Sequence, residues 1–202
     1  MKKISMLSAG ISVQGITKGA NQPSFLSSRG PIVISTWDAG MEANVPAWTI
    51  LEKGGQALDA VEQGVRYTED SINCCVGLGA NPDRDGYVTL DACIMDHNHN
   101  CGAVAFLERI KHPISVARRI MEKTPHVMLV GEGAQQFALS EGFPLESGQL
   151  SSSAQAAYSN WIQQSKYKTP SINRENKSGH GPFAPHRLQN GEWNHDTIGM
   201  IA

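Results

Sequence analysis

The sequence has no long apolar run, no excess of charge of either sign and few cysteines. Its 202 residues include 17 Lys and Arg against 19 Asp and Glu, a formal net charge of −2. The basic residues are scattered rather than gathered in a stripe, which argues against nucleic-acid binding. No apolar segment reaches the ~18 residues that a membrane span needs. We therefore expect a small molecule or another protein chain as partner, and neither nucleic acid nor membrane.

The cysteines are too few for a disulfide framework, since only 4 occur in a chain of this length. Cys74 and Cys75 are adjacent, which is poor geometry for a bond between them. Cys93 and Cys101 flank a turn and could face each other across a hairpin. Free buried thiols are nevertheless the expected state.

Two groups of His, Asp and Cys could ligate a metal, but neither has the spacing of a standard zinc site, and both lie in polar turns or loops. They are Asp96, His97, His99 and Cys101 in one group, and His180, His186 and His195 in the other. Residues 130–134 resemble a dinucleotide-binding loop, but Gln136 stands where the third glycine is needed. We expect neither a metal nor a cofactor.

The first 30 residues stand apart from the rest. Lys2 and Lys3 precede a moderately apolar stretch from Ile4 to Ile16, and the small residues Gly19 and Ala20 follow. This order is typical of a secretory signal, although serines dilute the apolar part. The alternative is a disordered N-terminal tail.

Beyond residue 30 the hydrophobic pattern predicts a single domain of mixed helices and strands. Pro46 fits only near the first turn of its helix. Polar turns at residues 81–86 and 96–100 surround the second strand, so the second and third strands should form an antiparallel hairpin. The expected strands are 32–36 (buried), 88–95, 102–107 and 127–130, and the expected helices are 42–52, 57–68, 114–123, 134–140 and one capped by residues 151–153 that runs through Trp161.

The pattern vanishes between Lys166 and Asn194, where prolines, glycines and polar residues predict a long exposed loop. This loop ends at His195-Asp196-Thr197, and Thr197 opens a short apolar stretch that we expect to be a buried strand. A Thr hydroxyl is a weak nucleophile without a neighbouring base. Cutting the chain just before Thr197 would create an α-amine with a pKa of about 7.7–8.0, which can accept the hydroxyl proton.

The residues beside Thr197 suit that chemistry. The Asp196 carboxylate could orient or deprotonate the attacking hydroxyl, and His195 could position the same bond. The simpler alternatives are an ordinary strand threonine, a loop Asp in a local turn and a structural His.

Several stretches from Pro31 onward resemble the glycosylasparaginase family of N-terminal-nucleophile hydrolases, in the family's order and with similar spacing. These are residues 35–37 (STW), 54–62 (GGQALDAVE), 82–86 (PDRDG), 88–96 (VTLDACIMD), 113–118 (PISVAR), 123–131 (KTPHVMLVG) and 195–202 (HDTIGMIA). The resemblance implies an α+β fold, a four-layer αββα sandwich that is incomplete in this chain. It also implies an α-subunit part over residues 31–165, an exposed loop at 166–196 leading to the cut between Asp196 and Thr197, and the start of a β-subunit at 197–202.

The resemblance further implies an enzyme that cuts itself before Thr197 and then cleaves the amide between an asparagine side chain and N-acetylglucosamine. Thr197 would be nucleophile and, through its amine, base. Trp37 matches the family's substrate-contacting tryptophan, and Cys75 stands where the family usually has a serine linked to precursor activation. A thiol is a weaker hydrogen-bond partner than a hydroxyl, so self-cleavage is expected to be slower, or that role dispensable.

The implied partners are a glycoasparagine substrate, the β-subunit from the same precursor and a second αβ unit in a dimer. The implied location is periplasmic or secreted in a bacterium and lysosomal in a eukaryote. Because the family's substrate-gripping and oxyanion residues follow the nucleophile, we expect these 202 residues alone to be inactive. The alternatives are a plant-type asparaginase or isoaspartyl peptidase of the same fold, and a non-catalytic domain that binds a small ligand.

Overall fold

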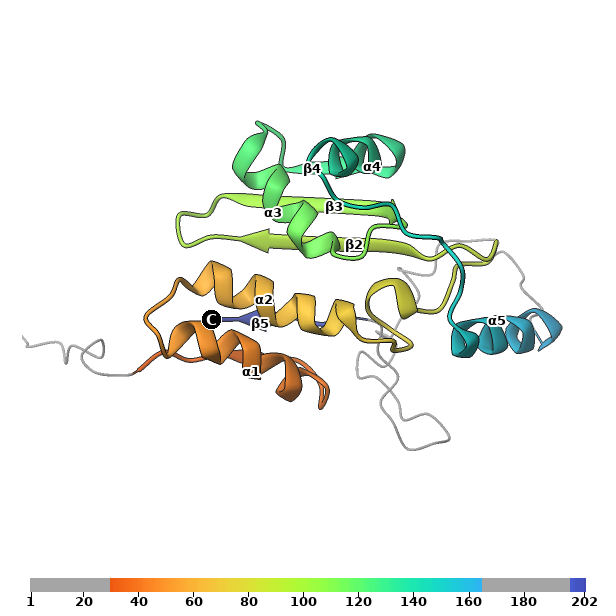
Figure 1. Ribbon diagram of the computed structural model, residues 1–202, viewed down its shortest axis with the longest axis horizontal. Coiled ribbons are helices and arrows are strands. Elements are labelled where there is room, and N and C mark those ends of the chain that lie inside the picture. Colours follow the sequence, from red (N-terminus) through yellow and green to blue (C-terminus); the bar gives the residue numbers. More distant parts are fainter. Residues whose placement is uncertain (1–29, 165–196) are drawn as a thin grey trace, which may run out of the picture. The chain divides into compact units, whose positions relative to one another are not determined.

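The structure is a computed structural model that describes residues 30–164 and 197–202. The described residues from Pro31 onward belong to one compact unit. The N-terminal segment up to residue 29, the expected loop at 166–194, His195 and Asp196 lie outside the described residues. The elements in chain order (Figure 1) are β1 (Ile34–Ser35), α1 (Gly40–Leu51), α2 (Ala57–Asp70), the 3-10 turn η1 (Gly77–Gly79), β2 (Thr89–Met95), β3 (Cys101–Glu108), α3 (Pro113–Lys123), β4 (Met128–Val130), α4 (Gly131–Ser140), α5 (Ser152–Gln164) and β5 (Met200–Ile201).

Strands β2, β3 and β4 form a three-stranded sheet in that order. The first two are the expected antiparallel hairpin, and β4 joins β3 in parallel. The tight turn between β2 and β3 is held by Asp96, whose Oδ1 accepts the N–H groups of Asn98 and Asn100 at 2.8 and 2.9 Å. A short Asx turn of this kind brings the two strands into register.

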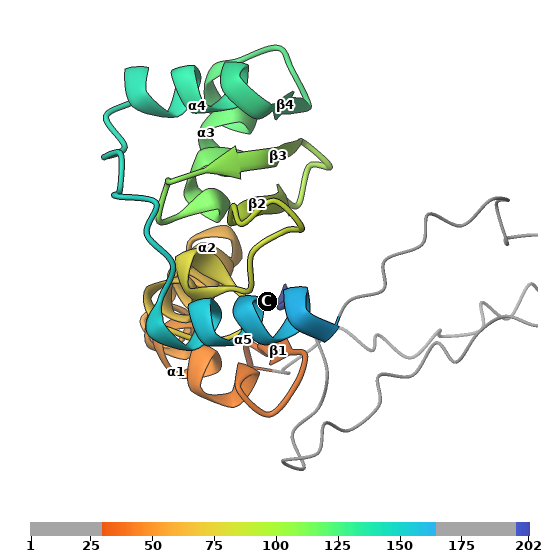
Figure 2. The same cartoon turned by 90° about the vertical axis from the view of Figure 1, so that its right-hand side faces the viewer.

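Helix α3 packs directly on the hairpin and supplies the main core. Its Val116 and Ile120 are fully buried together with Val104 and Leu107 of β3. The approach is close because β3 has a glycine there: a Cβ built on Gly102 would lie 2.7 Å from the Met121 backbone nitrogen. Helix α4 packs on β3 as well, and in both views α4 lies at the opposite end of this unit from α1 (Figure 2).

A second, smaller core lies between α1 and α2, which pack against each other. Ala47, Leu51 and Ala60 are its buried members, and Val33 and Met200 pack against them. Strands β1 and β5 form a separate two-stranded antiparallel sheet beside these helices, in which Ile34 faces Ile201 and Ser35 faces Met200. The last residues of the chain are therefore joined to its first strand.

The expectation that these two strands are buried is wrong. Ile34 is 62% exposed and Ile201 is 75% exposed. Among the described residues, helices cover only one face of this ribbon, and the ladder has two residue pairs, so the outward side chains find no cover. The strand expected at 32–36 is correspondingly short, Ile34–Ser35.

The other elements differ from expectation mainly at their ends. Helix α1 begins at Gly40 rather than at residue 42, so Pro46 lies in its second turn instead of its first. Helix α4 begins at Gly131, directly after β4. Ser151 caps α5 as expected, since its Oγ accepts the N–H of Ala154 at 3.2 Å. The α+β class is confirmed, and no helix in the described ranges is long and apolar enough to cross a bilayer.

Candidate functional site

Thr197 lies at the start of the segment that forms β5, and its side chain is exposed. The segment is fixed two residues later. The backbone N–H of Thr36 donates to the carbonyl of Gly199 at 2.9 Å, and the N–H of Gly199 donates to Oγ1 of Thr36 at 2.9 Å. These bonds extend the β1–β5 pairing toward Thr197. The structure thus holds the candidate nucleophile close to the end of β1.

Trp37 follows Thr36 directly and occupies an unusual backbone conformation. Its φ is +65°, in the left-handed region that a bulky side chain rarely adopts. The Trp37 carbonyl accepts the N–H of Gly40 at 3.1 Å, which closes the turn that leads into α1. Backbone strain of this kind persists only where the surrounding structure enforces it, and it is frequent at functional sites. The backbone that carries the half-buried indole is therefore fixed in position near the Thr197 segment.

Met200 attaches β5 to the helices. It packs against the α1–α2 core, and Gly64 of α2 leaves the space for it. A Cβ built on Gly64 would lie 2.6 Å from Sδ of Met200 and 2.8 Å from the carbonyl oxygen of Ala43. Real Cβ atoms do not approach this closely, so a larger residue at position 64 would force the Met200 side chain and the Ala43 backbone to move. The Thr197 segment is therefore held on one side by β1 and on the other by α2.

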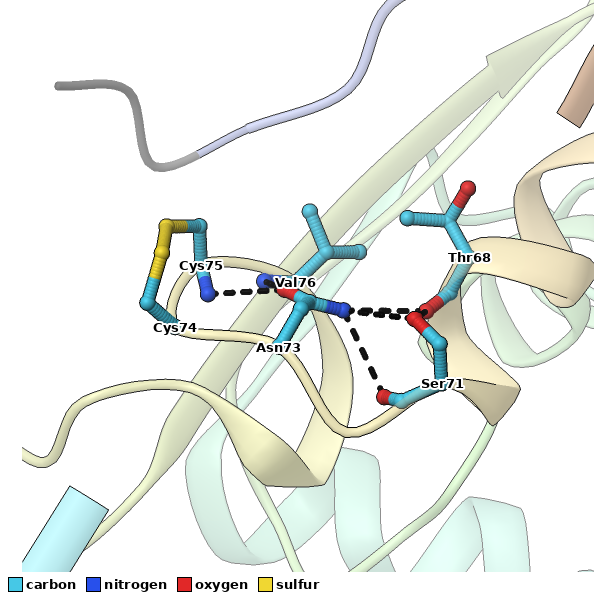
Figure 3. Close-up of a disulfide and its surroundings, with 6 residues drawn as sticks. All are labelled: Thr68, Ser71, Asn73, Cys74, Cys75 and Val76. Carbon is cyan, nitrogen blue, oxygen red and sulfur yellow. Dashed lines mark hydrogen bonds between the residues drawn. A yellow bond between two sulfur atoms is a disulfide. The ribbon is translucent and has the colours of Figure 1, made fainter. Parts of the chain in front are cut away.

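Cys75 lies in the loop between α2 and η1, and its state corrects an expectation. Cys74 and Cys75 are joined by a disulfide rather than present as free thiols (Figure 3). Their Cα atoms are 3.7 Å apart, below the usual range of about 4.4–6.8 Å, and this is why adjacent cysteines were expected to stay apart. Cys93 and Cys101 are free, and neither is fully buried.

Asn73 organises this loop through both ends of its side-chain amide. Its Oδ1 accepts the N–H groups of Cys75 and Val76 at 2.7 and 2.6 Å. Its Nδ2 donates to the carbonyl of Thr68 at 3.2 Å and to Oγ of Ser71 at 2.9 Å (Figure 3). The loop that carries Cys75 is thus tied to the last turn of α2.

The same end of α2 holds a buried carboxylate. The Glu69 side chain is 2% exposed and accepts the N–H of Ile114 at 3.0 Å. Nδ1 of His112 lies 3.3 Å from its other oxygen. Burial raises the pKa of Glu69 above its ordinary value of 4.5, although the His112 and Ile114 contacts oppose the shift. This carboxylate joins α2 to the start of α3.

Farther along α3, Arg118 is shared by three carboxylates. Its guanidinium lies 2.6 Å from Asp59, 2.7 Å from Glu62 and 2.7 Å from Glu122. These hydrogen bonds hold the pKa of Arg118 above its usual range, against the opposing effect of burial. Arg118 lines a polar cavity of about 410 Å³. Because its charge is already neutralised by these partners, we assign Arg118 a structural role.

The described ranges contain no cluster of three or more metal-ligating side chains. Asp96, the first residue of one candidate ligand group, instead holds its own turn. The other group, His180, His186 and His195, lies outside the described residues.

Thr36 is a site residue that the sequence did not reveal. It belongs to the stretch Ser35-Thr36-Trp37 that carries part of the resemblance, but within that stretch only Trp37 was expected to have a role. A hydroxyl residue just past a strand end is a signal for a backbone cap, and that signal could have identified Thr36.

Comparison with known proteins identifies the family of this chain. A family model described as Asparaginase matches residues 33–202. The N(4)-(beta-N-acetylglucosaminyl)-L-asparaginase of Elizabethkingia miricola is 48% identical over 100% of this chain and 54% of its own length. The proteins of that name from mouse and rat are 39% and 37% identical, over 87% and 85% of this chain and 54% and 53% of their own lengths. The chain spans about half the length of these curated relatives. The resemblance found in the sequence is confirmed, and the chain belongs to the asparaginase family.

Proposed function

We propose that this protein is an amidohydrolase that activates itself by cutting before Thr197 and then hydrolyses the bond between an asparagine side chain and N-acetylglucosamine. One observation carries the proposal: Thr197 stands at the start of the segment that leads into β5, and Thr36 and Gly64 hold this segment on two sides. The 48% identity to a relative named for this reaction supports the choice of substrate.

The proposed self-cleavage begins when the Thr197 hydroxyl attacks the carbonyl carbon of Asp196. The peptide C–N bond breaks as the ester C–O bond forms, and the nitrogen remains on Thr197 as its free amine. Water then hydrolyses the ester, which leaves a carboxylate on residue 196 and returns the hydroxyl. In this scheme the Asp196 side chain orients or deprotonates the hydroxyl and His195 positions the scissile bond.

Turnover of substrate uses the same hydroxyl. The amine of Thr197 accepts its proton, and the oxygen attacks the side-chain amide of the glycosylated asparagine. The sugar leaves on its amine, and water hydrolyses the resulting aspartyl ester. Trp37 is the proposed wall of the substrate pocket, because an indole held in a fixed turn offers a rigid apolar face. Cys75 is proposed to act in activation rather than in turnover.

The length of the relatives supports a β-subunit as the first proposed partner, and the resemblance implies the dimer. The residues that complete the site would come from a β-subunit released by the same cut, and two αβ units would pair as a dimer. We further propose an exported or lysosomal location. The basic, apolar and small residues in order over positions 2–20 support it, because this order is typical of a secretory signal.

The test uses the complete gene product and its variants Thr197→Ala and Thr197→Ser. On a denaturing gel the wild type should separate into two chains whose second begins at Thr197, Thr197→Ser should do so more slowly, and Thr197→Ala should remain whole. Only the cut proteins should release aspartate from N-acetylglucosaminyl-asparagine. A wild type that stays uncut and is nevertheless active contradicts the proposal.

The same assay separates the alternatives. The description of the family model, Asparaginase, favours free asparagine as a second candidate substrate, and the resemblance left an isoaspartyl peptide open as another. Faster aspartate release from those compounds than from the glycosylated one would favour this candidate. A non-catalytic domain would bind the glycosylated compound equally well as wild type and as Thr197→Ala, without release of aspartate from either.

A further inference from the structure

The disulfide between Cys74 and Cys75 lies where a reductant can reach it. Cys74 is exposed and Cys75 is half-buried, in the loop that follows α2. Disulfides exchange by attack of a thiolate on one sulfur, so access to the bond is the first requirement for its reduction. This bond meets that requirement.

The loop does not depend on the disulfide for its shape. Asn73 binds the backbone N–H groups of Cys75 and Val76 with its oxygen, and the carbonyl of Thr68 with its nitrogen (Figure 3). These contacts involve no sulfur atom. Opening the disulfide therefore changes the two side chains while the backbone around them keeps its hydrogen bonds.

The loop and the Thr197 segment rest on the same helix. Thr68 and Glu69 in the last turns of α2 carry the loop, and a Cβ built on Gly77 would lie 2.8 Å from the carbonyl oxygen of Glu69. Gly64, about one helical turn before Thr68, carries Met200 of β5. The loop that carries Cys75 and the segment that carries Thr197 are thus both attached to α2.

We propose that Cys74–Cys75 is a redox site whose reduction permits self-cleavage before Thr197. The reductant is a dithiol: one of its sulfurs attacks the disulfide and forms a mixed disulfide, and its second sulfur releases the protein thiol. The protein disulfide gains two electrons and two protons, and the dithiol becomes a cyclic or intramolecular disulfide. A reduced Cys75 has an S–H that donates a weak hydrogen bond, whereas a disulfide sulfur has no hydrogen to donate.

The effect of reduction on self-cleavage rests on the proposed function. The reduction of the disulfide itself is tested separately. The oxidised chain is treated with an alkylating reagent before and after exposure to dithiothreitol. It is then digested, and the masses of its peptides are measured by mass spectrometry. The peptide that carries residues 74 and 75 should gain two alkyl groups only after reduction, while Cys93 and Cys101 react in both samples. A peptide that is alkylated equally before and after reduction overturns the proposal.

The consequence is measured as the rate of cutting between Asp196 and Thr197 in the complete gene product, prepared oxidised and prepared reduced. The reduced protein should cut about tenfold faster, the rate effect of one hydrogen bond made in the transition state. Cys74→Ser leaves Cys75 as a free thiol and should cut at the reduced rate under both conditions. Cys93→Ser, an exposed cysteine outside the pair, should keep the wild-type response.

The cutting rates distinguish failure of the redox inference from failure of the proposed function. Equal cutting rates in the oxidised and reduced wild type overturn this inference and leave the proposed function standing. No cutting in either state overturns both. The comparison of the two wild-type preparations needs no substitution, so it holds even where a variant fails to fold.

Discussion

Thr36 satisfies both backbone groups of Gly199: its N–H donates to the Gly199 carbonyl, and its Oγ1 accepts the Gly199 N–H, each at 2.9 Å. These residues are 163 positions apart in the sequence. Gly199 lies between the candidate nucleophile Thr197 and the anchor Met200. A single threonine therefore fixes the backbone direction of the segment on which the proposed chemistry depends.

Replacing Thr36 with Val keeps the shape of the side chain and removes the acceptor. The Gly199 N–H then has to find water, and we expect a loss of about 0.5–1.5 kcal/mol in the free energy of unfolding. The cut before Thr197 should also slow, because its backbone is less firmly held. Urea unfolding and a gel time course measure the two effects. Thr36→Ser retains the hydroxyl and should behave like the wild type; if it fails as badly as Thr36→Val, the hydroxyl is not the cause.

The long periodic elements could be predicted from the sequence because their signals are local. The β2–β3 hairpin follows from alternating apolar residues around the Asp96 turn, and α3 from its buried stripe of Val116 and Ile120. The two-residue pairing of β1 with β5 was not predicted. Its partners lie far apart, and the exposure of Ile34 depends on what covers the ribbon rather than on the residue itself.

The candidate site could be predicted in part for the same reason. Thr197 and Trp37 carry motif signals that can be read from neighbouring residues. Thr36 acts through a contact across the whole chain, which no local pattern reports. The Cys74–Cys75 bond was not expected because adjacent cysteines lie outside the usual geometry, and the backbone bonds of Asn73 that shape their loop cannot be foreseen from composition.

Gly64 offers a test of the contact between α2 and β5. A methyl group there would meet Sδ of Met200 at 2.6 Å and the carbonyl of Ala43 at 2.8 Å. Met200 can move, but the Ala43 backbone cannot move without shifting α1. We expect Gly64→Ala to lower the free energy of unfolding by about 1–3 kcal/mol, as overpacking usually does. Urea denaturation of the purified protein measures it.

The matched control is Gly133→Ala in helix α4. A Cβ built on Gly133 meets nothing within 4 Å, so the substitution adds helix propensity without a clash. It should raise the free energy of unfolding by about 0.5–1 kcal/mol. If both substitutions had the same effect, the close fit of Met200 on Gly64 would be refuted.

Glu69 makes the stability of the protein depend on pH. Its carboxylate is buried between α2 and α3, where loss of water raises its pKa above 4.5 in spite of the contacts from His112 and the Ile114 N–H. The folded protein therefore holds a proton on Glu69 that the unfolded chain has already lost. This contribution to stability is complete below pH 4.5 and is lost as the pH rises through the raised pKa of the folded state.

Glu69→Gln removes this titration while it keeps an oxygen for the Ile114 N–H. The free energy of unfolding, measured by urea denaturation at several pH values, should fall above pH 4.5 in the wild type relative to this variant. Each tenfold difference between the acid constants of the folded and unfolded states corresponds to about 1.4 kcal/mol. Glu52→Gln, a change at an exposed glutamate, should follow the wild type. A difference between wild type and Glu69→Gln that stays constant with pH would show that Glu69 does not titrate differently in the folded and unfolded states.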